Sequence, residues 1–162
     1  MGKDAEKTHP IIIAREPRTG CTYASWVPSK GATEGWIIKR LIMFIDGLGY
    51  PEVILKSDQE PAIEAVQEAV KMQRKQSTIL DNSPVGESRS TGLTEKTVQE
   101  VTGMIRTYLD QAEIKLSADK KEEDKTLING PLIAWLVEHA ATAITRAKVG
   151  IDGKTPYQRL KG

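Results

Sequence analysis

The chain has 162 residues, of which 39% are hydrophobic and 28% charged, with a formal net charge of +1. This length suits a single domain (residues 1–162) whose core needs neither disulfides nor a structural metal. The sequence contains no apolar run of the roughly 20 residues that cross a bilayer, and its N-terminus lacks an apolar signal segment. We therefore expect no membrane role and a reducing intracellular compartment.

Composition also limits the kinds of site that the chain can form. Cys21 is the single cysteine, and His9 and His139 are the only histidines, so the chain cannot form a cysteine and histidine zinc module. We expect Cys21 to be an inert buried thiol in a strand. A net charge near zero means that any binding of nucleic acid depends on local positive charge or on other domains.

The first half of the chain predicts alternating strands and helices. Two extended segments, Ile11 to Arg15 and Cys21 to Val27, flank a turn with Pro17 and Gly20 and indicate a hairpin. Apolar residues at helical spacing predict a helix over 36–48. The short apolar run of residues 52–57 then predicts a buried strand that Asp58 terminates.

The second half predicts more helix. An amphipathic helix over 60–74 and a short strand over 77–80 precede a loop, residues 81–92, that is rich in Ser, Gly, Asn and Pro. The next predicted helix runs from Leu93 to about Ala112. Its expected core stripe is Val98, Val101, Ile105 and Leu109, and a neighbouring stripe is Glu95, Gln99, Thr102 and Arg106. A charged connector, an apolar helix after Pro131 and a segment of turn residues close the chain.

This order predicts an α/β fold with a mixed sheet that is flanked by helices. Acidic residues that follow strands in such folds meet at a common rim. Asp58 ends one strand, and Glu95 comes shortly after the loop, in the expected first turn of its helix and at the margin of its buried face. The 36 residues between them leave room for one helix, one strand and one returning loop.

Four segments together resemble the catalytic core of retroviral and retrotransposon integrases, a branch of the ribonuclease H-like superfamily. They are "AREPRTGCTYASWVPSKG", "KSDQEPA" with Asp58, "SPVGESRSTGLTEKTVQ" with Glu95, and the closing "GKTPYQRLKG". The resemblance covers nearly the whole chain, and the interval from Asp58 to Glu95 matches the family's usual spacing of about 35 residues. It implies a ribonuclease H-like fold with a mixed central sheet.

The resemblance also implies a function. Integrases of this type hold two divalent metals, Mg²⁺ or Mn²⁺, with an Asp, Asp, Glu set and transfer DNA strands. Asp58 matches the second family carboxylate and Glu95 the third. Thr91, Lys96, Gln99 and Arg106 match positions that contact DNA. DNA as partner, a homo-oligomer and action in the nucleus are further implications of the family.

Two departures from the family pattern affect the expected activity. The first carboxylate has no evident counterpart: Asp4, with 53 residues between it and Asp58, lies in a polar segment that does not resemble a strand. We therefore expect the first strand to be absent and the metal site to be incomplete. Where the family often has Ser-Asn-Gly, this chain has a threonine, Thr91, at the central position. Glu87 is a weaker alternative ligand.

Structural roles compete with these functional ones. Asp58 could cap a helix, Glu95 could face a helix dipole, and Lys96, Gln99 and Arg106 could simply solvate their helix. Three functions stay open at this point: an integrase-type polynucleotidyl transferase, a catalytically inactive integrase-like domain that binds nucleic acid or supports assembly, and a ribonuclease H-like nuclease that cuts without joining.

Overall fold

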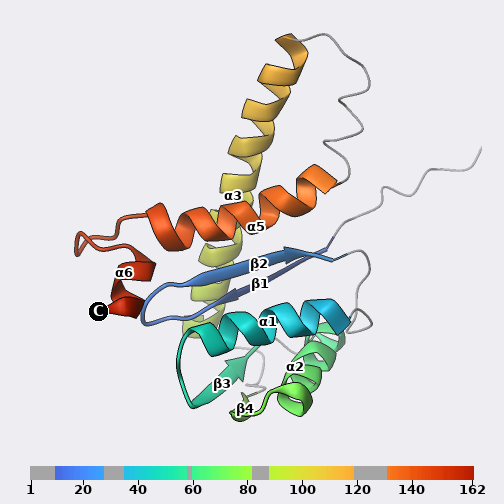
Figure 1. The fold of residues 1–162 in the computed structure, drawn as a ribbon, viewed down its shortest axis with the longest axis vertical. Coiled ribbons are helices and arrows are strands. Elements are labelled where there is room, and N and C mark those ends of the chain that lie inside the picture. Colours follow the sequence, from blue (N-terminus) through green and yellow to red (C-terminus); the bar gives the residue numbers. More distant parts are fainter. Residues whose placement is uncertain (1–9, 28–34, 58–59, 82–87, 119–130) are drawn as a thin grey trace, which may run out of the picture.

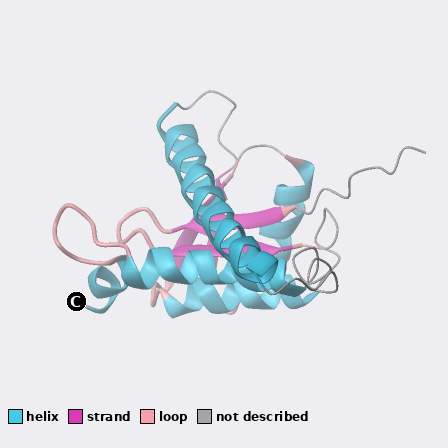
Figure 2. Cartoon of the chain, turned by 90° about the horizontal axis from the view of Figure 1, so that it is seen from above, coloured by secondary structure: helices cyan, strands magenta, loops and turns pink. Residues whose placement is uncertain are grey.

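The computed structural model describes residues 10–27, 35–57, 60–81, 88–118 and 131–162, and Figure 1 shows their arrangement. A hairpin is followed by a helix, a strand, a second helix, a second strand and a helical C-terminal half. The strands lie at the centre of the molecule with helices around them (Figure 2). This is the mixed α/β architecture that the sequence pattern predicts.

An antiparallel hairpin forms the middle layer. Strand β1 (Ile11–Arg15) pairs with β2 (Thr22–Trp26), as predicted. Gly20 in the turn has a φ of 86°, a left-handed conformation that glycine adopts without steric cost. The Glu16 carboxylate accepts the backbone N–H of Thr19 across the same turn. Both contributions hold the two strands in register.

One face of the hairpin packs on helices α1 (Gly35–Gly47) and α2 (Pro61–Gln73). Ile12 and Ala14 of β1 contribute to this contact, because alternate side chains of a strand point to the same face. We call the buried centre of this contact the α1–α2 cluster; it consists of Ile38, Leu41, Ile45, Val66 and Val70.

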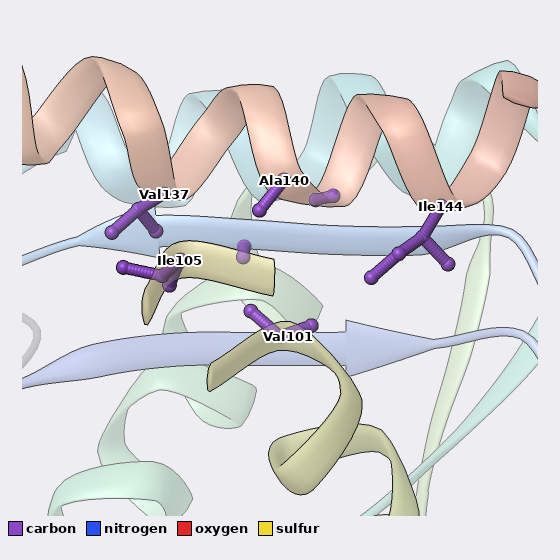
Figure 3. Close-up of a cluster of buried hydrophobic side chains, with 7 residues drawn as sticks. Val101, Ile105, Val137, Ala140 and Ile144 are labelled. Carbon is purple, nitrogen blue, oxygen red and sulfur yellow. The ribbon is translucent and has the colours of Figure 1, made fainter. Parts of the chain in front are cut away.

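The opposite face is covered by helices α3 (Ser88–Ala118) and α5 (Pro131–Ala147). Helix α5 lies on β2, and α3 packs against both α5 and β1. Side chains of the two helices point toward one another over the strands in Figure 3, namely Val101, Ile105, Val137, Ala140 and Ile144. The hairpin is therefore buried between two helical layers.

Strands β3 (Glu52–Lys56) and β4 (Ser77–Asp81) form a separate parallel pair. Arg74, whose side chain is fully buried, fixes the start of this pair. Its guanidinium donates hydrogen bonds to the Asp46 carboxylate, the Tyr50 and Ser77 carbonyls and the Thr78 hydroxyl. One arginine thus connects the end of α1, the entry to β3 and the start of β4.

The strand predicted over residues 52–57 is present as β3, but the prediction that it is buried was wrong. Val53 and Leu55 pack on the α1–α2 cluster, but Ile54 is 58% exposed, and its partner in register, Ile79, is 44% exposed. Helices α3 and α5 cover the hairpin instead, and no element within the described ranges packs closely enough on Ile54 and Ile79 to bury them.

Helix α3 is longer than the predicted helix from Leu93 to about Ala112 and begins five residues earlier, at Ser88. The predicted core residue Val98 is 43% exposed. Thr97 takes its place at 2% exposure, and its hydroxyl donates to a backbone carbonyl of the preceding turn. Thr97 and the buried Val101 are four residues apart and share one helical face.

The closing segment, predicted as turn residues, contains a short helix, α6 (Pro156–Lys161). Thr155 and Gln158 form a capping box at its start, with a proline in the first position. This combination is a sequence signal for a helix N-terminus that our prediction missed. Arg159 of α6 donates to the carbonyl of Thr19 and so ties the C-terminus to the hairpin turn.

Two further features concern exclusions drawn from composition. Cys21 is 1% exposed and is a free thiol, so the prediction of a buried cysteine is confirmed. Among the helices that the structure describes, none combines the length and the apolar character required to span a bilayer.

Candidate functional site

Asp58, the predicted second family carboxylate, lies outside the described residues. The chain before it is described as far as Ser57, whose hydroxyl donates to the Gln67 amide oxygen at 3.1 Å. Gln67 is 5% exposed on α2, so this hydrogen bond ties the end of β3 to a buried part of the fold. The pairing of Asp58 with Glu95 stays a prediction.

The carboxyl ends of β3 and β4 lie side by side because the two strands are parallel. Lys56 and Asp81 are partners in register at these ends, and Lys56 Nζ lies 2.8 Å from Asp81 Oδ2. Asp81 is therefore a further carboxylate at the carboxyl ends of this strand pair. Our sequence interpretation assigned it to the loop, although a parallel pairing of the two predicted strands would have placed it here.

Glu95 is the eighth residue of α3 and is exposed. The prediction that it lies in the first turn was wrong, because the helix begins at Ser88. Within the part of the chain that the structure describes, its carboxylate makes no hydrogen bond or ion pair. Its side chain thus lies on the solvent-exposed side of α3.

Glu100, one turn and a half further along α3, behaves differently. Its side chain is only 12% exposed. One carboxylate oxygen lies 2.7 Å from Arg15 Nη1 of β1, and the other is paired with Lys148 Nζ. The Glu100 carboxylate therefore joins α3 to β1 and to the end of α5. Of the two glutamates, Glu100 has a structural role and Glu95 faces solvent.

Positive charge gathers around Glu100. Burial lowers the pKa of Lys148, and repulsion from Arg15 and Lys96 lowers it further. Burial also lowers the pKa of Arg15, with an added contribution from Arg159. We call Arg15, Lys96 and Lys148 the basic cluster. Three cations thus accompany Glu100, the carboxylate that pairs with Arg15 and Lys148, although the whole chain is nearly neutral.

Sequence reasoning found only Lys96 of this cluster. Arg15 is 85 residues from Glu100 along the chain, and Lys148 is 48 residues away, so folding alone brings them together. The resemblance marked the α3 positions, whereas nothing in the local sequence around Arg15 or Lys148 indicates their partner.

The other predicted DNA-contacting residues lie on α3. Gln99 and Arg106 are exposed. At about 100° per residue they fall within about 40° of Glu95 around the helix axis, so the three share one face. Thr91 belongs to the first turn of α3, and its side chain lies outside what the structure describes. The exposed face of α3 therefore carries a carboxylate together with polar and basic side chains.

The described residues supply only part of the donor set that a metal ion needs. Carboxylate oxygens are the hard ligands that Mg²⁺ prefers, and Glu95 presents an exposed carboxylate on α3. Among the residues that the structure describes, no three His, Cys, Asp or Glu side chains lie close enough together to hold a metal ion. Asp4, Asp58 and Glu87 all fall outside those residues.

A separate groove lies between α1, β2 and α5. It has a volume of about 360 Å³ and is lined by both apolar and polar side chains, including Tyr23, Met43 and Phe44. Arg40 of α1 and Glu138 of α5 form an ion pair at this groove. Neither Glu95 nor the basic cluster contributes to it, so the groove is distinct from the candidate site.

Comparison with solved structures identifies the class of fold. The catalytic core domain of BIV integrase matches with a TM-score of 0.57 and 17% identity, over 93% of this chain and 84% of that chain. The HTLV-2 integrase catalytic core domain in complex with magnesium, in its trimeric form, matches with a TM-score of 0.62 and 16% identity, over 97% and 88%. This chain therefore has the ribonuclease H-like fold of retroviral integrase catalytic cores, and the predicted fold class is confirmed.

A larger assembly gives the same result. The simian T-cell lymphotropic virus intasome in complex with PP2A regulatory subunit B56 gamma matches with a TM-score of 0.64 and 17% identity. The match covers 94% of this chain and 48% of that chain, which is longer than the core alone. No family model and no curated protein match the sequence. The likeness is thus one of fold.

Proposed function

We propose that the chain is the catalytic core of a retroelement integrase, a metal-dependent polynucleotidyl transferase that processes DNA 3′ ends and joins them to target DNA. The observation that carries this proposal is Glu95 on α3 of an integrase-type fold, an exposed carboxylate that pairs with none of the described residues. Glu100 on the same helix is already paired, so Glu95 is distinguished by its availability.

In this proposal Asp58 and Glu95 are ligands of Mg²⁺ or Mn²⁺. When bound, two such ions would lower the pKa of the attacking oxygen and stabilise the leaving oxygen of a phosphodiester. The oxygen-donor set supports this assignment, as does the magnesium in the HTLV-2 integrase core. The protein's own contribution is orientation: the buried Thr97 and Val101 hold α3 on the core and present Glu95 outward.

DNA is the proposed partner, and the nucleus is the proposed place of action. Thr91, Lys96, Gln99 and Arg106 would contact DNA, and we add Arg15 and Lys148 because they extend the positive charge of Lys96 across β1 and the end of α5. A homo-oligomer is also proposed, supported by the trimeric and dimeric forms of the HTLV-2 core.

A second candidate function rests on the sequence. The first carboxylate of the family has no evident counterpart in this chain, so the second candidate is a core with an incomplete metal site. Such a domain would bind nucleic acid through the basic cluster, or support assembly, without catalysing strand transfer. The proposed single domain of residues 1–162 then lacks its first strand.

A strand-transfer assay with Mg²⁺ or Mn²⁺ and labelled DNA ends tests these functions together. Joined products that disappear in Asp58→Asn and Glu95→Gln support the integrase. Cleavage without joining indicates a ribonuclease H-like nuclease, and DNA binding without either product indicates the inactive module. Asp110→Asn is the matched control, since it removes one exposed carboxylate from α3 fifteen residues along the helix from Glu95. Joining that survives Glu95→Gln contradicts the assignment.

A further inference from the structure

Three aromatic side chains from two helices lie against one another at the surface. The rings of Trp135 and His139 on α5 are stacked, with their centroids 4.7 Å apart and their planes at 10°. Tyr108 of α3 lies against the same histidine, with a centroid distance of 5.1 Å. We call these three residues the aromatic stack. Trp135 remains 57% exposed, and His139 is exposed as well.

Stabilisation of one helix does not account for this arrangement. Trp135 and His139 are four positions apart on α5, a spacing at which side chains support their own helix. The aromatic stack, however, also includes a ring from α3, and the largest of its rings stays more than half exposed. A contiguous exposed aromatic surface indicates an interaction site more strongly than a single exposed residue does.

A groove between α3 and α5 begins at the aromatic stack. It has a volume of about 400 Å³, and its lining residues are Glu100, Met104, Tyr108, Ala143, Ala147 and Lys148. Tyr108 belongs both to the groove and to the aromatic stack, and Lys148 belongs both to the groove and to the basic cluster. The groove therefore connects an aromatic surface with a positively charged one.

The two ends of the groove suit two parts of one ligand. The Lys148 side chain is 51% exposed and Lys96 is exposed, so both ammonium groups are accessible to an anion. The indole of Trp135 offers a surface on which a planar ring can stack. Phosphates and nucleobases meet these two demands within one strand, and the base faces are accessible only where the strand is unpaired.

We propose that the aromatic stack, the groove and the basic cluster together bind a short single-stranded nucleic acid, with a base on Trp135 and phosphates at Lys148 and Lys96. Trp135 and Lys148 are 13 positions apart, which is about 20 Å along a helix. About six stacked nucleotides cover this distance, or fewer when the strand is extended. DNA and RNA share the base face and the phosphate. The proposal rests on the aromatic stack and the groove, and neither Asp58, Glu95 nor a metal ion takes part in it.

Titration with labelled oligonucleotides tests the proposal. The probes are oligodeoxythymidine and oligouridine of about eight nucleotides, and the control is an abasic strand with the same number of phosphates. The full chain is titrated in EDTA, so that the result does not depend on metal or on catalysis. Fluorescence anisotropy gives the affinity, and tryptophan emission reports stacking on the indole.

Two variants separate stacking at the groove from other effects. Trp135→Ala removes the exposed ring of the aromatic stack. Trp36→Ala is the matched control, because Trp36 is a 39% exposed tryptophan of α1 that does not line the groove. Urea denaturation checks that both variants are folded, and Trp135→Phe keeps an aromatic ring if the alanine variant is not.

We expect saturable binding of at least one of the two probes, and the probe that binds more tightly identifies the sugar that the site prefers. Trp135→Ala should weaken this binding by about fivefold to a hundredfold, the loss of one base stack, while Trp36→Ala leaves it unchanged. Tryptophan emission should fall on binding in the original chain and in Trp36→Ala, but not in Trp135→Ala. Three results overturn the proposal: no binding of either probe, equal binding of the abasic strand, or an equal loss of affinity in the two alanine variants.

Discussion

Replacement of Arg74 by methionine is expected to lower the free energy of unfolding by about 3–5 kcal/mol. Arg74 is fully buried and lies 2.7 Å from Asp46 Oδ1, 2.7 Å from the Ser77 carbonyl and 2.9 Å from the Tyr50 carbonyl. Methionine keeps most of the aliphatic volume but leaves both carbonyls without their donor. Both hydrogen bonds are partly buried, and a hydrogen bond from a charged donor contributes about 1.5–3 kcal/mol, so these two bonds account for most of the loss.

The ion pair itself contributes little to that figure, because the Asp46 side chain is 38% exposed and can turn to water. Asp46→Asn is therefore the matched control, with an expected cost of about 1 kcal/mol or less. Urea denaturation gives the free energy of unfolding of both variants. If the slope of this free energy against urea concentration is the same in both, their unfolded states are comparable. If Arg74→Met costs no more than Asp46→Asn, the role assigned to Arg74 at the start of β3 and β4 is refuted.

Three further predictions concern the rest of the chain. Lys148→Gln should weaken binding of DNA and reduce the slope of log affinity against log salt by about 0.9, and an unchanged slope would exclude Lys148 from phosphate contact. The hydrogen bond from Arg159 holds the pKa of Asp152 below its ordinary value of 3.8. The ionised Asp152 therefore stabilises the fold fully above pH 3.8, and this stabilisation is lost as the pH falls through the lower pKa of the folded state. Asp152→Asn should make the free energy of unfolding less dependent on pH in this acid range, and an unaltered pH profile would contradict the assignment. Ile144→Ala should cost about 2–5 kcal/mol in thermal or urea unfolding, whereas Ile151→Ala, at a fully exposed position, should change stability by at most about 0.5 kcal/mol, and equal costs would contradict the placement of the core.

The elements that the sequence predicts best are those whose signals are local. The hairpin has apolar runs on both sides of a turn in which Gly20 adopts a positive φ, and α1 has apolar residues at helical spacing up to Gly47. In both elements the deciding residues lie within a few positions of one another. Asp58 and Glu95 were instead assigned from the order of motifs along the chain, across 36 intervening residues, and their roles stay predictions.

Predictions failed where tertiary structure decides. Val98 is more apolar than Thr97 and fits the predicted core stripe of α3. The way in which α3 packs on the core nevertheless buries Thr97 and leaves Val98 exposed. The same applies to Ile54, since its exposure depends on which helices cover the sheet. The start of α3 at Ser88 is a different failure, because a stretch rich in Ser and Gly favours a loop on local propensity alone.

The basic cluster shows the same limit at a functional surface. Arg15 and Lys148 come from opposite ends of the chain and meet at Glu100 through folding. No charge run marks them, and the net charge of +1 conceals them. A sequence of balanced composition can therefore carry a local positive surface that only the folded structure reveals.

Binding of Mn²⁺ measured by electron paramagnetic resonance tests the central claim most directly, because it reports the metal site without requiring catalysis. We predict that the chain binds Mn²⁺ and that Asp58→Asn and Glu95→Gln each weaken this binding by about tenfold or more, equivalent to about 1.4 kcal/mol, while Asp110→Asn leaves it unchanged. Binding that is unaffected by Glu95→Gln, or that Asp110→Asn weakens equally, would contradict the assignment of Glu95 as a metal ligand.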